Sequence, residues 1–200
     1  MNKLNDMKEL LIASNNPHKT WEISSILSNN GTKVYSLNSK GIEIDVEETA
    51  DTLEGNAFKK AKEIYDAVEI PVISDDTGLF VDALDGRPGV YSARYAGENA
   101  SYSDNCYKLI SELKERDLNE SPAHFKTVIC LYLSPEEYHM FEGVCPGKII
   151  TEMRGENGFG YDPLFIPDGY NKTFAELSAE EKNEVSHRGK AIEKLKEYLA

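Results

Sequence analysis

The sequence predicts an α/β fold, with a mixed sheet and flanking helices. Short runs rich in apolar residues recur at KELLIA (8–13), TKVYSL (32–37) and PVIS (71–74), and each is typical of a strand. Two stretches with helical spacing, 20–29 and 52–68, separate these runs. The resulting order of strands and helices favours a sheet that is at least partly parallel.

The two helical stretches each have one apolar face. The apolar residues of the first are Trp21, Ile23, Ile26 and Leu27, and those of the second are Phe58, Ala61, Ile64, Tyr65 and Val68. Asn29-Asn30-Gly31 is expected to end the first helix. GIEIDVEE (41–48) alternates between apolar and polar residues before it ends in acids, so it predicts an additional strand.

The second half predicts an antiparallel extension of the sheet. HFKTVICLYL (124–133) is a strong strand, and YHMFEGVCPGKII (138–150) predicts two more with a turn at Pro146-Gly147. A helix over 103–116, capped by Ser103, precedes them. The glycine-rich segment 78–97 predicts a structured loop with short strands.

The chain closes with a loop and two helices. GENGFGYDPLFIPDG (155–169) has little intrinsic regularity. Ser178 and Glu181 form a capping box that opens a helix at 178–185. The closing helix, 186–199, has an apolar side made of Ala191, Ile192, Leu195 and Leu199.

Bulk composition limits the function. The chain has 200 residues, 40% of them hydrophobic, which suits a single domain over residues 1–200. Its net charge of −13 disfavours nucleic acids and anionic membranes as partners. We expect a cytoplasmic protein, because the first residues show no secretory signal and no stretch is apolar enough to span a membrane. The three cysteines have no metal-binding spacing and are expected to be reduced structural thiols.

The loop SNNPHK lies between a predicted strand end and a helix start, where free backbone N–H groups and the helix dipole favour an anion. Ser14 and Asn16 can donate side-chain hydrogen bonds, and Lys19 lies one turn into the helix. An ordinary N-cap turn is the alternative interpretation.

Two acidic pairs raise the question of a metal. In PVISDDTGLFVD (71–82), Asp75 and Asp76 follow the predicted strand, and successive strand residues point to opposite faces, so we expect different roles for them. Glu47 and Glu48 could approach the same sheet edge. Carboxylates with water in the remaining positions suit Mg²⁺, while Lys60 could balance this charge or contact phosphate. Solvated acidic turns and a surface lysine are the alternatives.

Two later segments could bind a nucleoside. In GFGYDP, glycines flank Phe159, whose ring can stack on a base, and Asp162 could accept from a ring N–H. In SHRGK, His187 and Arg188 lie at a helix start, where cations are unfavourable, so their placement needs a reason. A structural aromatic loop and a helix start with solvated charges are the alternatives.

These segments, in this order, resemble the inosine triphosphate pyrophosphatase family, also called the XTP/dITP diphosphatases. The motifs that carry the resemblance are SDDTGLFVDALDGRPGVYSARYAG, GFGYDPLF and SHRGKA. The resemblance implies two lobes around a central nucleotide-binding cleft and a homodimer. It also implies Mg²⁺-dependent hydrolysis of the purine nucleoside triphosphates ITP, dITP and XTP to the monophosphate and pyrophosphate.

The resemblance also implies a role for each matched position. The expected metal ligands are Glu48 and Asp76, and the expected catalytic residues are Asp76, as general base, and Lys60, near the phosphates. The expected substrate-binding residues are Ser14, Asn15, Asn16, Lys19, Thr77, Phe159, Gly160, Tyr161, Asp162, Lys182, His187 and Arg188. Ala50 and Gly55 depart from the family pattern, which often has glycine and glutamate there.

Two other functions stay open. A nucleotide-binding regulator without turnover would keep SNNPHK and SHRGK but would not need the acids. A phosphomonoesterase with an aspartate nucleophile would need a DxD pattern, which DDTG does not match.

For the pyrophosphatase, we expect base choice to depend on Arg188, whose donors match the 6-keto oxygen of hypoxanthine and not the 6-amino group of adenine.

Overall fold

The structure is a computed structural model that describes residues 9–27 and 33–200. The predicted absence of a signal and the predicted helix stop at Asn29-Asn30-Gly31 fall outside the described residues. The described helices are α2 (Pro17–Leu27), α3 (Leu53–Val68), α4 (Tyr102–Lys114), α5 (Ala179–Val185) and α6 (His187–Leu199). The described strands are β1 (Leu10–Ile12), β2 (Val34–Ser36), β3 (Val72–Val81), β4 (Pro88–Gly89), β5 (Glu120–Ser134), β6 (Glu137–Ile150) and β7 (Phe165–Pro167).

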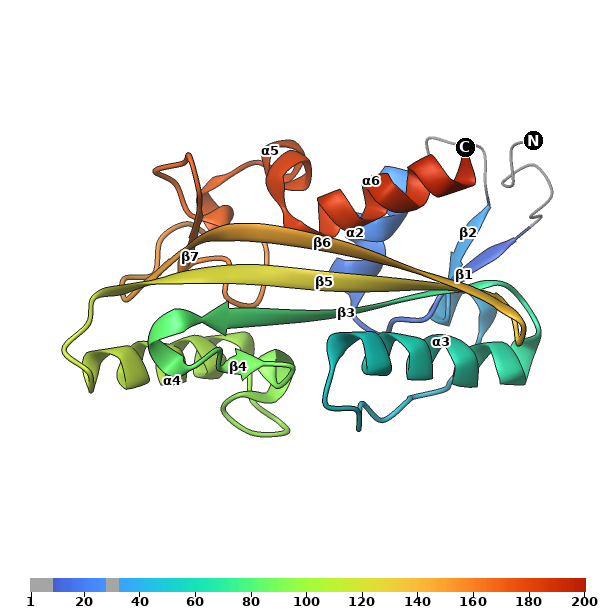
Figure 1. Ribbon diagram of the computed structural model, residues 1–200, viewed down its shortest axis with the longest axis horizontal. Helices are drawn as coiled ribbons and strands as arrows, with labels where there is room; N and C mark the ends of the chain where they lie inside the picture. Colours follow the sequence, from blue (N-terminus) through green and yellow to red (C-terminus); the bar gives the residue numbers. More distant parts are fainter. Residues whose placement is uncertain (1–8, 28–32) are drawn as a thin grey trace. The chain divides into compact units, whose positions relative to one another are not determined.

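The described strands form one seven-stranded mixed sheet in the order β2-β1-β3-β5-β6-β7, with β4 paired to β3 (Figure 1). β1 pairs in parallel with both β2 and β3, whereas the β3–β4 and β6–β7 pairs are antiparallel. The mixed α/β fold predicted from the sequence is confirmed.

The chain divides into two compact units. Unit 1 comprises residues 1–76, 127–143 and 188–200, and unit 2 comprises residues 77–126 and 144–187. The single domain over residues 1–200 stays a prediction, and the units are described one at a time.

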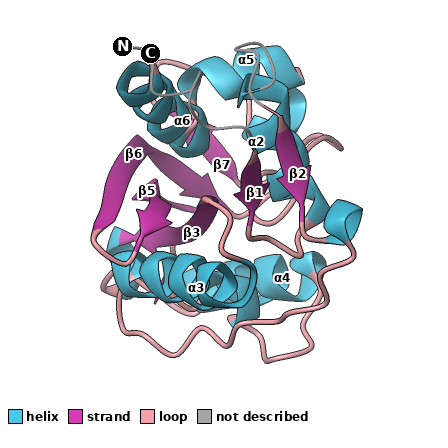
Figure 2. Cartoon of the chain, turned by 90° about the vertical axis from the view of Figure 1, so that its right-hand side faces the viewer, coloured by secondary structure: helices cyan, strands magenta, loops and turns pink. Residues whose placement is uncertain are grey.

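Unit 1 has a sheet covered on both faces. Helices α2 and α6 lie on one face and α3 on the other (Figure 2). All three residues of β1 are fully buried, as a strand covered on both sides requires. The predicted apolar side of the closing helix is confirmed, because Ala191, Ile192, Leu195 and Leu199 are fully buried against Ile23, Ile73 and Leu131.

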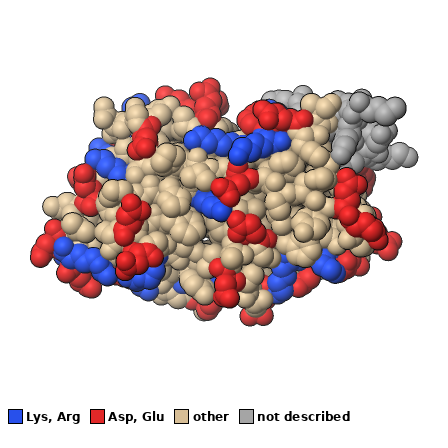
Figure 3. Space-filling model, in the orientation of Figure 1, with Lys and Arg blue, Asp and Glu red and all other residues tan. Residues whose placement is uncertain are grey.

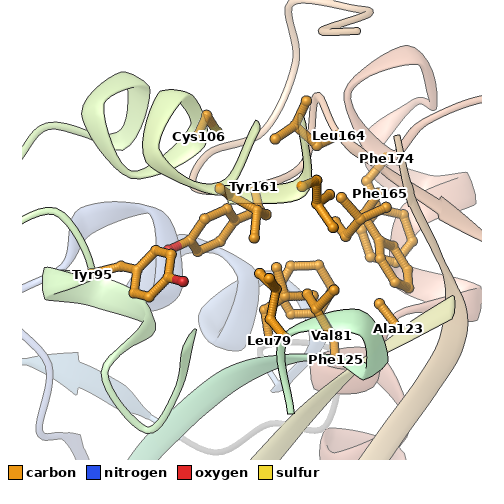
Figure 4. Packing of buried hydrophobic residues seen from close by; sticks show 14 of the residues in the cluster. Leu79, Val81, Tyr95, Cys106, Ala123, Phe125, Tyr161, Leu164, Phe165 and Phe174 are labelled. Carbon is orange, nitrogen blue, oxygen red and sulfur yellow. The ribbon is translucent and has the colours of Figure 1, made fainter. Parts of the chain in front are cut away.

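Unit 2 has its own apolar core. Phe125, Phe165 and Phe174 pack together with Leu79, Val81, Leu164 and Tyr161 (Figure 4). The ring centroids of Phe125 and Phe165 are 4.8 Å apart in an edge-to-face arrangement. Helix α5 opens with the predicted Ser178–Glu181 capping box. Cys106, Cys130 and Cys145 are buried, and none of them forms a disulfide bond.

Several boundaries differ from the sequence predictions. Residues 42–50 form no strand, although their burial alternates residue by residue, because the segment has no ladder partner. Helix α2 begins at Pro17 rather than residue 20, with proline in the favoured first position. The cap of α4 is Ser101, in a capping box with Asp104, and not Ser103.

The predicted turn at Pro146-Gly147 is wrong, because β6 runs unbroken through both residues. The reason for glycine there is close packing with β7. A Cβ at position 147 would lie 2.3 Å from the carbonyl oxygen of Ile166.

None of the helices within the described residues is long and apolar enough to cross a lipid bilayer.

Candidate active site

Asp75 and Asp76 lie inside β3, and not after the strand as the sequence predicted. Their side chains contact different elements of unit 1. Asp75 Oδ2 is 3.2 Å from Lys19 Nζ of α2, while Asp76 Oδ2 accepts a hydrogen bond of 3.1 Å from Asn56 Nδ2 of α3. Since α2 and α3 cover opposite faces of the sheet (Figure 2), the alternation of a strand separates the two acids by role.

The Asp75 side is a buried ion cluster. Arg188, at the start of α6, donates from Nη2 to Asp75 Oδ2 at 3.3 Å and from Nη1 to Glu22 of α2. Only 2% of Arg188 and 1% of Asp75 is exposed. Burial opposes the ionisation of Asp75, but the charges of Lys19, Arg188 and Lys60 outweigh it and lower its pKa below the usual range. The negative charges of Asp75 and Glu22 therefore explain why the cationic Arg188 lies at the start of α6.

The Asp76 side is centred on Lys60. The Lys60 ammonium donates to Glu48 Oε1 and, at 2.7 Å, to the carbonyl oxygen of Asp75, and it lies 4.0 Å from Asp76 Oδ1. Burial raises the pKa of Asp76, and the nearby Lys60 and Lys19 only partly offset it. Burial acts on Glu48 in the same direction, but there the Lys60 charge prevails and lowers the pKa.

Asn56 links Asp76 to the backbone of the segment that contains Glu48. Its Oδ1 accepts a hydrogen bond of 2.9 Å from the backbone N–H of Ala50, two residues beyond Glu48, while its Nδ2 donates to Asp76. The side chain is fully buried. Asn56 and Lys60 are four residues apart on α3, so both face the same place.

The SNNPHK loop caps helix α2. Asn16 Oδ1 accepts from the backbone N–H groups of His18 and Lys19, at 3.0 and 3.3 Å, and Ser14 Oγ accepts from the N–H of Asn16 at 3.2 Å. Two N–H groups that the sequence predicted for phosphate are thus held by Asn16. Asn15 Nδ2 donates to Asp45 Oδ1 at 3.2 Å.

In unit 2, Asp162 organises the glycine-aromatic loop. Its Oδ2 accepts from the backbone N–H of Phe159 at 2.9 Å and from Lys182 Nζ at 2.7 Å. Lys182 Nζ also lies 5.0 Å from the centroid of the Phe159 ring, a cation–π contact. Gly158 has a φ of 75°, and a Cβ there would lie 2.0 Å from Asp162 Oδ2, so only glycine fits.

Two other expected nucleoside contacts of unit 2, Tyr161 and His187, are buried and pack against other residues. Tyr161 points into the core (Figure 4), with 4% exposed, and its hydroxyl donates to the carbonyl oxygen of Ser92 at 2.9 Å. The His187 ring stacks on Phe125 with centroids 4.5 Å apart. Thr77 belongs to β3, and Gly160 has a φ of 62°. Contact of these residues with a nucleoside stays a prediction.

The expected residues therefore fall into two sets. Unit 1 contains Ser14, Asn15, Asn16, Lys19, Glu48, Lys60, Asp76 and Arg188, and unit 2 contains Thr77, Phe159, Gly160, Tyr161, Asp162, Lys182 and His187. Sequence reasoning missed Glu22 and Asn56. A signal existed for both, because each shares a helix face with a predicted residue, Glu22 with Lys19 and Asn56 with Lys60.

A metal at Glu48 and Asp76 fits the donor chemistry. Both side chains offer carboxylate oxygens, and both lie within 4.0 Å of the Lys60 ammonium group. Their negative charges therefore stabilise positive charge at this position. Residues 9–27 and 33–200 contain no group of three or more His, Cys, Asp or Glu side chains that could hold a metal ion. A hard cation here would therefore need water and substrate oxygens as its remaining ligands.

The chain is similar to known proteins over most of its length. The model of the Ham1 family matches residues 10–198. The chain belongs to the Ham1 family. A relative called dITP/XTP pyrophosphatase in Caldanaerobacter subterraneus subsp. tengcongensis is 50% identical over 194 residues, covering 96% of each protein. The family resemblance predicted from the sequence is confirmed.

Solved structures of Ham1 proteins share the fold. The Staphylococcus aureus Ham1 protein is 42% identical with a TM-score of 0.84, and the match covers 96% of this chain and 98% of that one. A HAM1 protein from Coxiella burnetii is 37% identical with a TM-score of 0.88, at the same coverage.

Proposed function

We propose that the protein hydrolyses the deaminated purine nucleoside triphosphates dITP, ITP and XTP to the monophosphate and pyrophosphate, and so removes them from the nucleotide pool. Relatives named dITP/XTP pyrophosphatase support the substrate class. The observation that carries the proposal is the pair of carboxylates, Glu48 and Asp76, on either side of Lys60. Lys19, from the loop that is proposed to bind phosphate, pairs with the neighbouring Asp75.

Mg²⁺ is the proposed cofactor, held by Glu48 and Asp76. When bound, it would supply positive charge that screens the phosphate oxygens. The two carboxylates come from different segments. Asn56 donates to Asp76 and accepts from the backbone N–H of Ala50, two residues beyond Glu48.

Asp76 is the proposed general base. Water attacks the α-phosphorus, the bond from that phosphorus to the oxygen bridging the β-phosphorus breaks, and pyrophosphate leaves. The proton of the water passes to Asp76, directly or through a second water. A raised pKa makes this carboxylate a better proton acceptor than an ordinary aspartate.

Lys19 and Lys60 are proposed to stabilise the leaving pyrophosphate. Lys19 is only partly buried and is held near the loop by Asp75. Two ammonium groups close to the phosphates would offset the charge that develops on the leaving group.

Arg188 as the reader of the base stays a prediction. Asp75 and Glu22 accept hydrogen bonds from its Nε, Nη1 and Nη2. Arg188 can contact a 6-keto oxygen only through donors that these carboxylates do not take. The two-lobed cleft also stays a prediction.

A product assay tests the proposed function. The protein is incubated with Mg²⁺ and dITP, ITP, XTP, GTP or ATP, and pyrophosphate and orthophosphate are measured separately. Pyrophosphate from the three deaminated substrates is expected, with little from ATP. Orthophosphate alone would indicate a phosphomonoesterase, and the absence of both products would indicate a regulator.

We also propose a homodimer in the cytoplasm. The homodimer rests on the family resemblance, and three buried cysteines that form no disulfide bond are compatible with a reducing compartment. Sedimentation equilibrium would test the dimer, since a single species at the mass of one chain would contradict it.

A further inference from the structure

Lys60 occupies the centre of the two expected metal ligands. Its ammonium group donates to Glu48 Oε1 and to the carbonyl oxygen of Asp75, and lies 4.0 Å from Asp76 Oδ1. The side chain of Lys60 is 14% exposed, and those of Glu48 and Asp76 are 22% and 5% exposed. An ammonium group has three N–H donors and no acceptor, so oxygen atoms on several sides suit it as they suit a metal ion.

Helix α3 positions this ammonium group. The helix begins after Thr52, whose side chain accepts from the N–H of Gly55, and Asn56 and Lys60 follow on one face. Asn56 bonds to Asp76 and to the backbone N–H of Ala50, two residues beyond Glu48, and Lys60 contacts both acids. The two acids are therefore fixed near each other, and without a positive charge between them they would repel.

We propose that Lys60 is a resident counter-ion, which takes the place of the divalent cation between Glu48 and Asp76 and has to leave Glu48 when the cation binds. This inference rests on the proposed function, because it concerns the same metal-binding acids. It makes Lys60 a positioning residue as well as a phosphate-binding one.

Competition between Lys60 and the metal has two consequences. The metal alone binds weakly, because it must displace a cation that already pairs with its ligands. A phosphate group that accepts the displaced ammonium favours metal binding, and by linkage the metal favours phosphate binding equally. The protein thus gathers metal and triphosphate together.

Direct metal binding tests the inference without turnover. Mn²⁺ is titrated into the nucleotide-free wild type, Lys60→Met and Lys60→Arg, and free Mn²⁺ is followed by electron paramagnetic resonance. We expect Lys60→Met to bind Mn²⁺ roughly tenfold more tightly or better, since repulsion from an ammonium group about 4 Å away is removed. Lys60→Arg keeps the charge and should stay near the wild type.

Lys62→Met is the matched control. Lys62 lies on the same helix and pairs with Asp66, away from the two acids, and its side chain is 47% exposed. Its Mn²⁺ affinity should equal that of the wild type. Equal or weaker binding in Lys60→Met than in the wild type would overturn the proposal, as would the absence of binding in both.

A second measurement on unaltered protein covers the case in which Lys60→Met does not fold. Lysine side chains are labelled with ¹³C at Cε, and the Lys60 resonance is assigned with Lys60→Arg. Saturation with Mg²⁺ should shift the Lys60 resonance and leave that of Lys62 in place. A Lys60 resonance that does not move while Mg²⁺ binds would refute the displacement. Failure to release pyrophosphate, with the Lys60 effects present, would contradict only the proposed function.

Discussion

Asp75 and Asp76 are neighbours on β3, yet the fold moves the pKa values of their carboxyl groups in opposite directions. Both are buried, which disfavours the charged form. Around Asp75 the charges of Lys19 and Arg188 overcome burial and lower the pKa, whereas around Asp76 burial prevails and raises it. Asp75 is thus the permanent anion that holds the cations in place, and Asp76 is the group able to exchange a proton.

Asp76→Asn should separate activity from stability. Turnover of dITP should fall by ~100-fold or more, the scale for loss of a general base. The unfolding midpoint should stay or rise, because a buried carboxylate that resists ionisation is replaced by a neutral group of the same shape. Pyrophosphate release and urea unfolding measure the two effects.

Asp75→Asn is the matched comparison for that variant. It leaves Lys19 and Arg188 without their shared anion, and breaking a buried pair in this way costs about 3–5 kcal/mol of unfolding free energy. Near-normal turnover in Asp76→Asn, or equal stability of the two variants, would contradict these roles.

The pH profile should report Asp76. Because burial raises the pKa of Asp76 above that of an ordinary aspartate, the acidic limb of kcat/KM for dITP should lie above the pH at which an ordinary aspartate titrates. Activity should rise with pH through this limb as Asp76 loses its proton. Rates of pyrophosphate release at low dITP, measured at several Mg²⁺ concentrations and extrapolated to low Mg²⁺, give the profile. A limb at or below the pH at which an ordinary aspartate titrates would exclude Asp76 as the group observed.

At the scale of elements, Ala50 and Gly55 explain each other. A Cβ at Gly55, in the first turn of α3, would lie 2.7 Å from the Cβ of Ala50, closer than two carbons can approach. At both positions, the residue differs from the one that the family resemblance leads us to expect. Their contact indicates that a methyl group at 50 occupies the space that a side chain at 55 would need.

This contact predicts a coupled effect of substitution. Gly55→Ala, normally stabilising in a helix by about 0.5–1 kcal/mol, should here destabilise the protein. Ala50→Gly should rescue it, with a coupling free energy of about 0.5–3 kcal/mol in a double-mutant cycle. Urea unfolding of the four proteins measures the cycle, and simple additivity would show that the two positions do not compete for space.

Much of this fold was predictable from periodicity, and the exceptions have physical causes. The spacing of Ala191, Ile192, Leu195 and Leu199 predicted the buried side of α6 because one helix face carries the signal. The alternation of apolar and polar residues at 41–48 led to a wrong prediction of a strand. Such alternation shows which side chains face the protein, but it does not show whether a neighbouring strand is available for backbone hydrogen bonds. In the candidate site, Asp75 and Asp76 could be predicted because they directly follow a recognisable strand sequence. Glu22 was missed because its partner, Arg188, is 166 residues away.

At the scale of the whole molecule, charge is the dominant property. The chain has 22 Lys and Arg residues against 35 Asp and Glu residues, a net charge of −13. On the face that Figure 3 shows, acidic side chains are spread widely, with lysine and arginine among them. Net charge of one sign repels itself in the compact state, so the surface charges as a whole oppose folding.

Salt should therefore stabilise the protein. Raising NaCl from about 10 mM to about 150 mM shortens the Debye length from about 30 Å to about 8 Å and screens this repulsion, so the melting temperature should rise. Exposed pairs such as Lys62–Asp66 weaken at the same time, but each contributes only about 0–1 kcal/mol. The buried cluster of Arg188, Glu22 and Asp75 is screened much less, so it should be retained. Calorimetry in NaCl and KCl at matched ionic strength measures the effect and separates screening from ion-specific binding. A melting temperature that falls steadily with salt would mean that surface ion pairs, and not net repulsion, dominate the electrostatics of folding.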